Sequence, residues 1–195
     1  MNAQTNTKRS EAQTSSHPTS STIDPEDVAR FSAIAEEWWD ENGKFKPLHR
    51  INPLRIGYIR EHAVAHFGLD DSAASPFSGL KLLDVGCGGG LISEPMARLG
   101  AEVTGIDASE KNVAVAGLHA EQTSTPLTYK ATTAEALANE GGQYDIVLAL
   151  EIIEHVADLN LFYDAITTLV KPGGLLVLST INRNPKSYAM AIVGA

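Results

Sequence analysis

The chain of 195 residues has one cysteine, Cys87, few basic side chains relative to acidic ones, and no long apolar run. A single cysteine excludes an intramolecular disulfide and is typical of a reducing compartment, so a cytoplasmic protein is expected. No run approaches the roughly 18 to 20 apolar residues that cross a bilayer. The 15 basic and 24 acidic side chains give a net charge of −9, which offers no general field for a phosphate backbone. Nucleic acid is therefore not an expected partner.

Residues 1–22 contain no Leu, Ile, Val or aromatic residue and are rich in Ser, Thr, Asn and Gln. They also lack the apolar core of a secretory signal. Because such a segment has little to bury, nothing offsets the entropy lost on ordering it. The composition predicts a disordered tail.

Residues 23–70 carry two apolar patterns with helical spacing. Asp24, followed by a proline and early acidic residues, predicts the start of a helix that runs to about Trp39. The second helix is predicted to begin after Asn52, with a proline in its first turn, and to stop at Gly68. We expect these N-terminal helices to cover the active site.

Beyond a Ser/Ala/Pro/Gly linker, short apolar runs alternate with helical segments, as in βαβ units with a parallel sheet. The last helix is predicted to end before Lys171, and Pro95 is compatible only with the first turn of its helix. We predict an α/β, Rossmann-like core over residues 79–195, with helices on both faces of the sheet. The predicted strands cover residues 80–85, 102–106, 127–130, 144–150 and 175–180.

A glycine-rich loop, residues 84–90, follows the first predicted strand. Successive glycines let the backbone approach a ligand closely, and the helix start that follows points free N–H groups toward it. Asp107 ends the second strand, where its carboxylate could accept both hydroxyls of a ribose. These features favour a nucleotide-containing cofactor, although turns also collect glycine for purely structural reasons.

The residues around the loop distinguish between three kinds of nucleotide-binding site. A P-loop requires Gly-Lys-Ser/Thr, whereas this loop continues Gly90-Leu91-Ile92, so that site is excluded. The dinucleotide pattern G-x-G-x-x-G places its third glycine at Leu91, which weakens a nicotinamide oxidoreductase. Leu83 to Gly90 instead resembles the first motif of Rossmann-like methyltransferases. A nucleophilic role for Cys87 is disfavoured because no base is assigned to it.

A second polar group follows the strand at residues 144–150. If this segment is helical, Glu151, Glu154 and His155 stand at i, i+3 and i+4 and converge on one face. Two carboxylates and an imidazole suit an octahedral ion such as Mg²⁺. Two other interpretations stay open: an acidic helix start with a solvated histidine, or His155 as a general base.

Several strings together resemble the ubiquinone-biosynthesis O-methyltransferases. The most specific are Trp38-Trp39-Asp40 and residues 45–55, which read FKPLHRINPLR. The others are the glycine loop, Glu151 to His155, and the segments at 171–174 and 179–184. Together they extend over nearly all of the chain after the tail.

The resemblance implies transfer of methyl groups from S-adenosylmethionine to hydroxyls of polyprenylated phenol or catechol intermediates. It also implies peripheral contact with lipid at the inner membrane. In addition, it implies metal-dependent chemistry at Glu151, Glu154 and His155, and His155 could instead act as a general base. Carried over residue by residue, it predicts cofactor contacts at Arg55, Asp84, Gly86, Gly88, Asp107 and Leu150.

Methyltransferases of this class complete a seven-stranded sheet, and this sequence shows five strands before Ala195. We therefore expect a C-terminally truncated domain whose final strands are missing, in which residues 182–195 begin the family's lipid-contacting insertion. A cofactor-binding but inert fragment is the alternative function.

Overall fold

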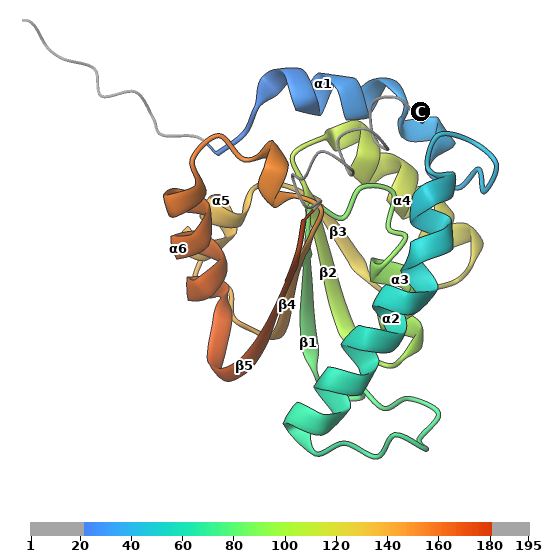
Figure 1. Cartoon of the computed structure of the whole chain (residues 1–195), viewed down its shortest axis with the longest axis vertical. Helices are drawn as coiled ribbons and strands as arrows, with labels where there is room; N and C mark the ends of the chain where they lie inside the picture. Colours follow the sequence, from blue (N-terminus) through green and yellow to red (C-terminus); the bar gives the residue numbers. More distant parts are fainter. Residues whose placement is uncertain (1–21, 181–195) are drawn as a thin grey trace, which may run out of the picture.

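The computed structural model describes residues 22–180 (Figure 1). The predicted disordered tail up to residue 21, and the predicted insertion start after residue 181, lie outside the described residues. Thr22, which the sequence assigns to the tail, is 7% exposed, and its Oγ1 donates a hydrogen bond of 2.6 Å to Glu135 Oε1. The prediction of disorder is therefore wrong for Thr22, because contacts with distant residues bury it.

Within residues 22–180, five parallel strands form one sheet in the order β3-β2-β1-β4-β5. The Rossmann-like α/β fold is confirmed, and the first four strands lie within one residue of their predicted bounds. The strands are β1 (Lys81–Val85), β2 (Glu102–Asp107), β3 (Thr128–Ala131), β4 (Tyr144–Leu150) and β5 (Val170–Ser179).

The fifth strand begins earlier than predicted. Val170 already pairs with Tyr144, and the register then shifts before Leu175 pairs with Ile146. The Lys-Pro-Gly-Gly segment thus forms an irregularity inside β5 and not a turn before it. The helix that precedes β5 ends at Leu169, as predicted.

Helices cover both faces of the sheet (Figure 1). The helices α2 (Lys46–Phe67) and α3 (Ser93–Arg98) bury Ile59 and Met96 against one face. On the other face, α5 (Ala134–Asn139) and α6 (Leu159–Leu169) bury Leu137 and Ile166. The helix α4 (Glu110–Gln122) packs beside β3. Pro95 lies in the first turn of α3, where its missing N–H breaks no helical hydrogen bond.

Two predicted helix bounds are wrong. The helix α1 (Pro25–Ala33) begins as predicted, with Asp24 Oδ1 accepting from the Glu26 amide, but it does not reach Trp39. A short 3-10 helix, η1 (Ala35–Glu37), follows it. The helix α2 starts at Lys46 and contains Pro53, so the segment before Asn52 is helical. The reason is tertiary: Trp38 and Phe45 turn inward and stack with ring centroids 3.8 Å apart.

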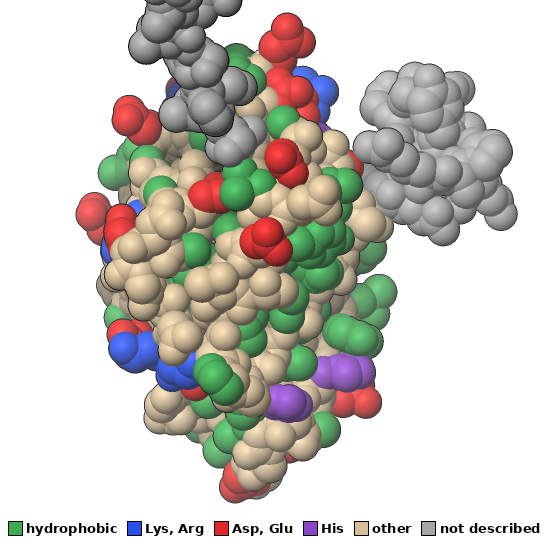
Figure 2. All heavy atoms as spheres, turned by 90° about the vertical axis from the view of Figure 1, so that its left-hand side faces the viewer, with side chains coloured by type: hydrophobic (Ala, Val, Ile, Leu, Met, Phe, Trp, Pro, Cys, Tyr) green, Lys and Arg blue, Asp and Glu red, His purple; other side chains and the backbone are tan. Residues whose placement is uncertain are grey.

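The side of the molecule that carries α6 and β5 shows apolar side chains among scattered acidic ones (Figure 2). Leu159, Tyr163 and Leu178 are partly exposed there, at 45%, 38% and 38%. No helix within residues 22–180 is long and apolar enough to cross a membrane.

Candidate functional site

The strand order reverses between β1 and β4, because the chain leaves β1 toward β2 and leaves β4 toward β5. In open α/β sheets, ligands bind outside the carboxyl ends of the strands at such a point. A cavity of about 330 Å³ lies at this edge, within the size range of small-molecule sites. The helix α1 lies across these strand ends (Figure 1) and contributes Val28 and Phe31 to the cavity wall. The cavity is therefore the candidate site.

All residues predicted to bind cofactor or metal or to act as base line this one cavity: Arg55, Asp84, Gly86, Gly88, Asp107, Leu150, Glu151, Glu154 and His155. They come from four separate parts of the chain, which the sheet brings together. Their individual roles stay predictions.

The glycine loop joins β1 to α3. The amides of Gly86 and Cys87 donate to the Ile106 carbonyl at 2.8 and 2.9 Å, which fastens the loop to the end of β2. Gly88 has φ +53, and a Cβ there would lie 2.5 Å from the Trp38 ring. A side chain at Gly88 would therefore be strained and would also overlap a tryptophan.

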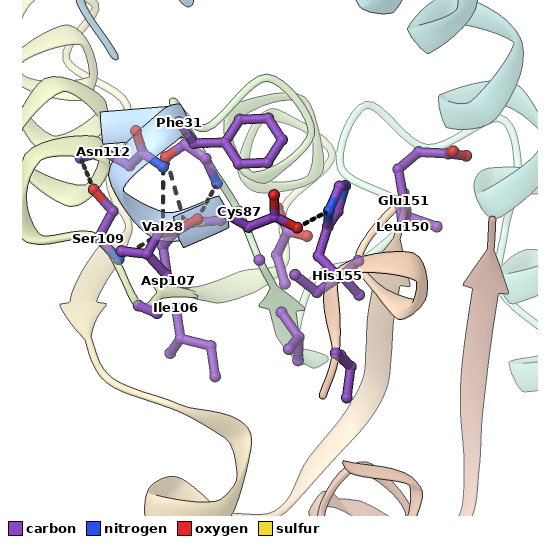
Figure 3. Close-up of a pocket in the computed structure, with 18 of the residues that line it drawn as sticks. Val28, Phe31, Cys87, Ile106, Asp107, Ser109, Asn112, Leu150, Glu151 and His155 are labelled. Atoms are coloured by element: carbon purple, nitrogen blue, oxygen red, sulfur yellow. Dashed lines mark hydrogen bonds and ion pairs between the residues drawn. The ribbon is translucent and has the colours of Figure 1, made fainter. Parts of the chain in front are cut away.

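Asp107 accepts three hydrogen bonds at the end of β2 (Figure 3). Its Oδ2 accepts from the Gly88 amide at 2.9 Å, and its Oδ1 from the Ser109 amide and the Asn112 side chain at 2.8 and 3.2 Å. Burial raises the pKa of Asp107, against the effect of these donors. Since a carboxylate has about four acceptor positions, Oδ2 can accept one further donor from the cavity.

Asp84, at the end of β1, is 3% exposed and accepts a 2.5 Å hydrogen bond from Ser93 Oγ. Burial, assisted by the nearby Asp107 charge, raises the pKa of Asp84 to about 6. Besides lining the cavity, Asp84 thus fixes the first turn of α3 beneath the glycine loop.

Arg55 and Glu151 form a 2.5 Å ion pair between α2 and the end of β4. Glu151 Oε1 also accepts from Ser179 Oγ at 2.9 Å, and the Glu151 backbone has φ +53. In Figure 3 the Glu151 carboxylate points away from the His155 ring. The Arg55 charge at the cavity is thus balanced by a carboxylate of the same site.

The sequence predicted convergence of Glu151, Glu154 and His155 on the condition that this segment is helical, and it forms no α-helix here. The segment forms a 3-10 turn, η2 (Ile153–His155). The three side chains each contact a different partner. Glu154 Oε2 accepts from Thr180 Oγ1 at 2.8 Å, whereas Glu154 Oε1 is buried without a partner in the described structure. His155 Nδ1 lies 2.7 Å from Asp27 Oδ2. Within residues 22–180 no group of three or more His, Cys, Asp or Glu side chains is placed to hold a metal ion.

Cys87 is 7% exposed, and burial, with the Asp84 and Asp107 charges, raises the pKa of its thiol. The thiolate is the nucleophilic form, so this environment opposes a nucleophilic role. The structure therefore agrees with the prediction that Cys87 is not a nucleophile.

Two residues that line the cavity, Trp38 and Asp27, were not predicted from the sequence as part of the site. Trp38 covers the glycine loop, and its Nε1 donates to Asn112 Oδ1 at 3.1 Å, while Asn112 in turn donates to Asp107. The tandem tryptophans belong to a family-specific string, but no neighbouring residue in the sequence indicates what they contact. Asp27 is recognisable from the sequence only as an acidic residue at a helix start.

Comparison with known proteins places these features in a family. A family model described as a methyltransferase domain matches residues 83–178. Among solved structures, magnesium protoporphyrin IX methyltransferase from Synechocystis with bound S-adenosylhomocysteine superposes with a TM-score of 0.63. It is 24% identical, and the match covers 87% of this chain and 72% of that one. This likeness supports the fold.

Curated relatives are much more similar to this chain in sequence than that solved structure is. The ubiquinone biosynthesis O-methyltransferase of Cereibacter sphaeroides is 60% identical over 90% of this chain and 71% of its own length. That of Ruegeria pomeroyi is 58% identical over 92% of this chain and 71% of its own length. Identity at this level over most of both chains means that the chain belongs to the ubiquinone biosynthesis O-methyltransferase family.

Proposed function

We propose that the chain transfers a methyl group from S-adenosylmethionine to a hydroxyl of a polyprenylated phenol or catechol in ubiquinone biosynthesis. The observation that supports this most directly is the meeting of the glycine loop, Asp107 and the end of β4 around one cavity at the strand-order reversal. Membership of the ubiquinone biosynthesis O-methyltransferase family supports the reaction class.

The residues of the cavity fit an aminoacyl nucleoside. The free acceptor position on Asp107 Oδ2 suits a ribose hydroxyl, at about 1.5 to 3 kcal/mol for a hydrogen bond to a charged group. Gly86 and Gly88 contribute no side chain to the cavity, and Leu150 contributes an apolar one to its wall. Arg55, which has donors beyond its bond to Glu151, is suited to the carboxylate of the methionine part.

When bound, the cofactor supplies an electrophilic methyl group on a sulfonium. The chain's own contribution is to fix the acceptor hydroxyl in line with that group and to exclude water. Val28 and Phe31 of α1 give the cavity an apolar roof that suits an aromatic head group. A phenol must lose its proton as the new bond forms, and we assign the acceptance of that proton to His155.

The family resemblance also implies a Mg²⁺ site. The residues present do not fit such a site in this conformation. Glu151 is paired with Arg55, and His155 with Asp27, so the three predicted ligands do not face a common point. Only Glu154 Oε1 offers a free buried oxygen among the three side chains. We therefore assign the acceptance of the proton to His155 alone.

A lipid tail requires an apolar path out of the cavity. Ile51, Leu54 and Tyr58 lie on one face of α2 and are 42%, 75% and 55% exposed. They neighbour Arg55, which lines the cavity. We place the isoprenoid tail on this face, with peripheral contact to a membrane where the tail is anchored.

Incubation of the protein with methyl-labelled S-adenosylmethionine and a short-chain demethylubiquinol tests the proposal. The wild-type protein should label the quinol, and Asp107→Ala should abolish labelling and weaken binding of S-adenosylhomocysteine. Asp164→Ala, which removes an exposed carboxylate on α6, is the matched control and should behave as wild type. Binding of S-adenosylhomocysteine without label in any phenol or catechol would support the inert alternative.

A further inference from the structure

We propose that Asp27, on the N-terminal helix α1, is a positioning residue that holds the imidazole of His155 in the tautomer and orientation needed to accept the substrate's proton. The inference rests on the proposed function for its catalytic consequence. Its structural part, the fixed tautomer, can be measured without turnover.

The contact is close and joins distant parts of the chain. Asp27 Oδ2 lies 2.7 Å from His155 Nδ1, across a separation of 128 residues. Both side chains are mostly buried, with 25% of Asp27 and 24% of His155 accessible, and both line the cavity. Water therefore competes weakly for this hydrogen bond.

The partner determines which ring nitrogen carries the proton. An ionised carboxylate only accepts hydrogen bonds, so Nδ1 must donate to Asp27. In the neutral ring this leaves the lone pair on Nε2. His155 is then oriented by one nitrogen, while the other is the one able to take a proton from a bound hydroxyl.

The orientation is supported by further contacts of the N-terminal segment. The Ala157 amide donates to the Thr22 carbonyl at 2.9 Å, and Ile23 forms an antiparallel bridge with Val156. The Phe31 ring packs edge-on against the His155 ring, with centroids 5.2 Å apart. The segment from Thr22 through α1 is thus attached to the two residues that follow the histidine and to its ring, and Asp27 is its polar contact with the ring.

Among the described residues, Asp27 has one other charged partner. Arg30 Nη2 lies 2.8 Å from Asp27 Oδ1, one helical turn away, and 61% of the Arg30 side chain is accessible. This pair occupies the oxygen that does not contact His155. Glu26, the adjacent carboxylate of α1, is exposed. Glu26→Ala therefore removes the same charge from the same turn without touching the ring.

The first measurement is the histidine ¹⁵N chemical shift pattern by NMR, with His155→Gln identifying the resonances. In the wild-type chain His155 should be protonated at Nδ1 and carry its lone pair on Nε2. Asp27→Ala should abolish this preference, Asp27→Glu should restore it in part, and Glu26→Ala should leave it unchanged. An unchanged His155 tautomer in Asp27→Ala would overturn the proposal. If Asp27→Ala does not fold, Asp27→Leu, which has a similar size and accepts no hydrogen bond, is measured by the same criteria.

The second measurement is steady-state kinetics. Asp27→Ala should lower kcat about 10- to 100-fold, less than the roughly 10²- to 10⁴-fold that a general base contributes. KM for the catechol and Kd for S-adenosylhomocysteine should change less than about threefold, since Asp27 contacts neither ligand in the proposed arrangement. A kcat within twofold of wild type would overturn the catalytic part. If wild type itself fails to methylate the catechol, the proposed function fails, while the tautomer result still decides whether Asp27 positions His155.

Discussion

The indole of Trp39 stacks on the imidazole of His119, with ring centroids 3.4 Å apart and planes 6° from parallel. On one side the Trp39 Nε1 donates to the Gly89 carbonyl at 2.9 Å. On the other side His119 Nδ1 lies 2.6 Å from Glu94 Oε1. A continuous series of contacts therefore runs from a buried carboxylate in α3 to the backbone of the glycine loop.

Trp39→Phe should weaken cofactor binding more than it weakens folding. Phenylalanine keeps a ring for stacking but removes the N–H that holds the Gly89 carbonyl. A hydrogen bond of this kind contributes about 1 kcal/mol, so we expect roughly a fivefold loss of S-adenosylhomocysteine affinity by calorimetry. Tyr163→Phe, on the exposed face of α6, is the control and should leave affinity unchanged. Equal affinities for Trp39→Phe and wild type would mean that the loop does not depend on this bond.

Glu94→Ala should strongly destabilise the fold. Glu94 is fully buried and contacts Arg98, His119 and Thr123. The substitution removes hydrogen bonds to a buried carboxylate, each worth about 1.5 to 3 kcal/mol. Urea unfolding measures the difference, and Glu121→Ala, an exposed carboxylate in α4, should stay within about 0.5 kcal/mol of wild type. A loss of less than 1 kcal/mol for Glu94→Ala would contradict the importance of this cluster.

The sheet could be predicted because its signals are local. Buried strands such as β4 are continuous apolar runs, and the loop, cap and glycine signals between them are read from neighbouring residues. The end of α1 could not be predicted in this way. Its helical pattern continues to Trp39, but the two tryptophans turn inward to contact the glycine loop, and this tertiary contact outweighs helix propensity.

The positions that line the cavity could be predicted, but their mutual geometry could not. Asp107 and Glu151 were assigned from their places at strand ends, which meet at one edge in any parallel sheet. The expected metal-binding face depended on a helical turn at Glu151. There the backbone takes φ +53, and Arg55, 96 residues away, binds the carboxylate. A contact over such a separation leaves no periodic signal in the sequence.

Gly88→Ala should reduce both stability and cofactor binding. Its Cβ would meet the Trp38 ring at 2.5 Å, and φ +53 is strained for alanine, at a cost of about 1 to 3 kcal/mol. Gly117→Ala, in α4, is the matched control because a Cβ there meets nothing within 4 Å. It should stabilise the protein by about 0.5 to 1 kcal/mol, as alanine does in helices. Thermal unfolding with and without S-adenosylhomocysteine distinguishes the two, and similar behaviour of both variants would contradict the proposed packing of Trp38 on the loop.

Asp84→Asn should stabilise the protein at alkaline pH and not at acidic pH. Burial raises the pKa of Asp84 from 3.8 to about 6, so the protonated carboxyl is the form that the folded protein favours. The stability that comes from this protonated form is fully present below about pH 4 and is lost as the pH rises through 6. A shift of about two pKa units corresponds to roughly 3 kcal/mol, which is the upper bound for the stability gained with the uncharged amide.

Urea unfolding of wild type and Asp84→Asn at pH 4 and pH 8 measures this difference directly, because the two proteins share all other titrating groups. Glu102→Gln, on the exposed start of β2, provides the matched removal of a charge and should show no such dependence. An Asp84→Asn effect that is the same at both pH values would mean that Asp84 titrates normally and that its burial carries no electrostatic cost.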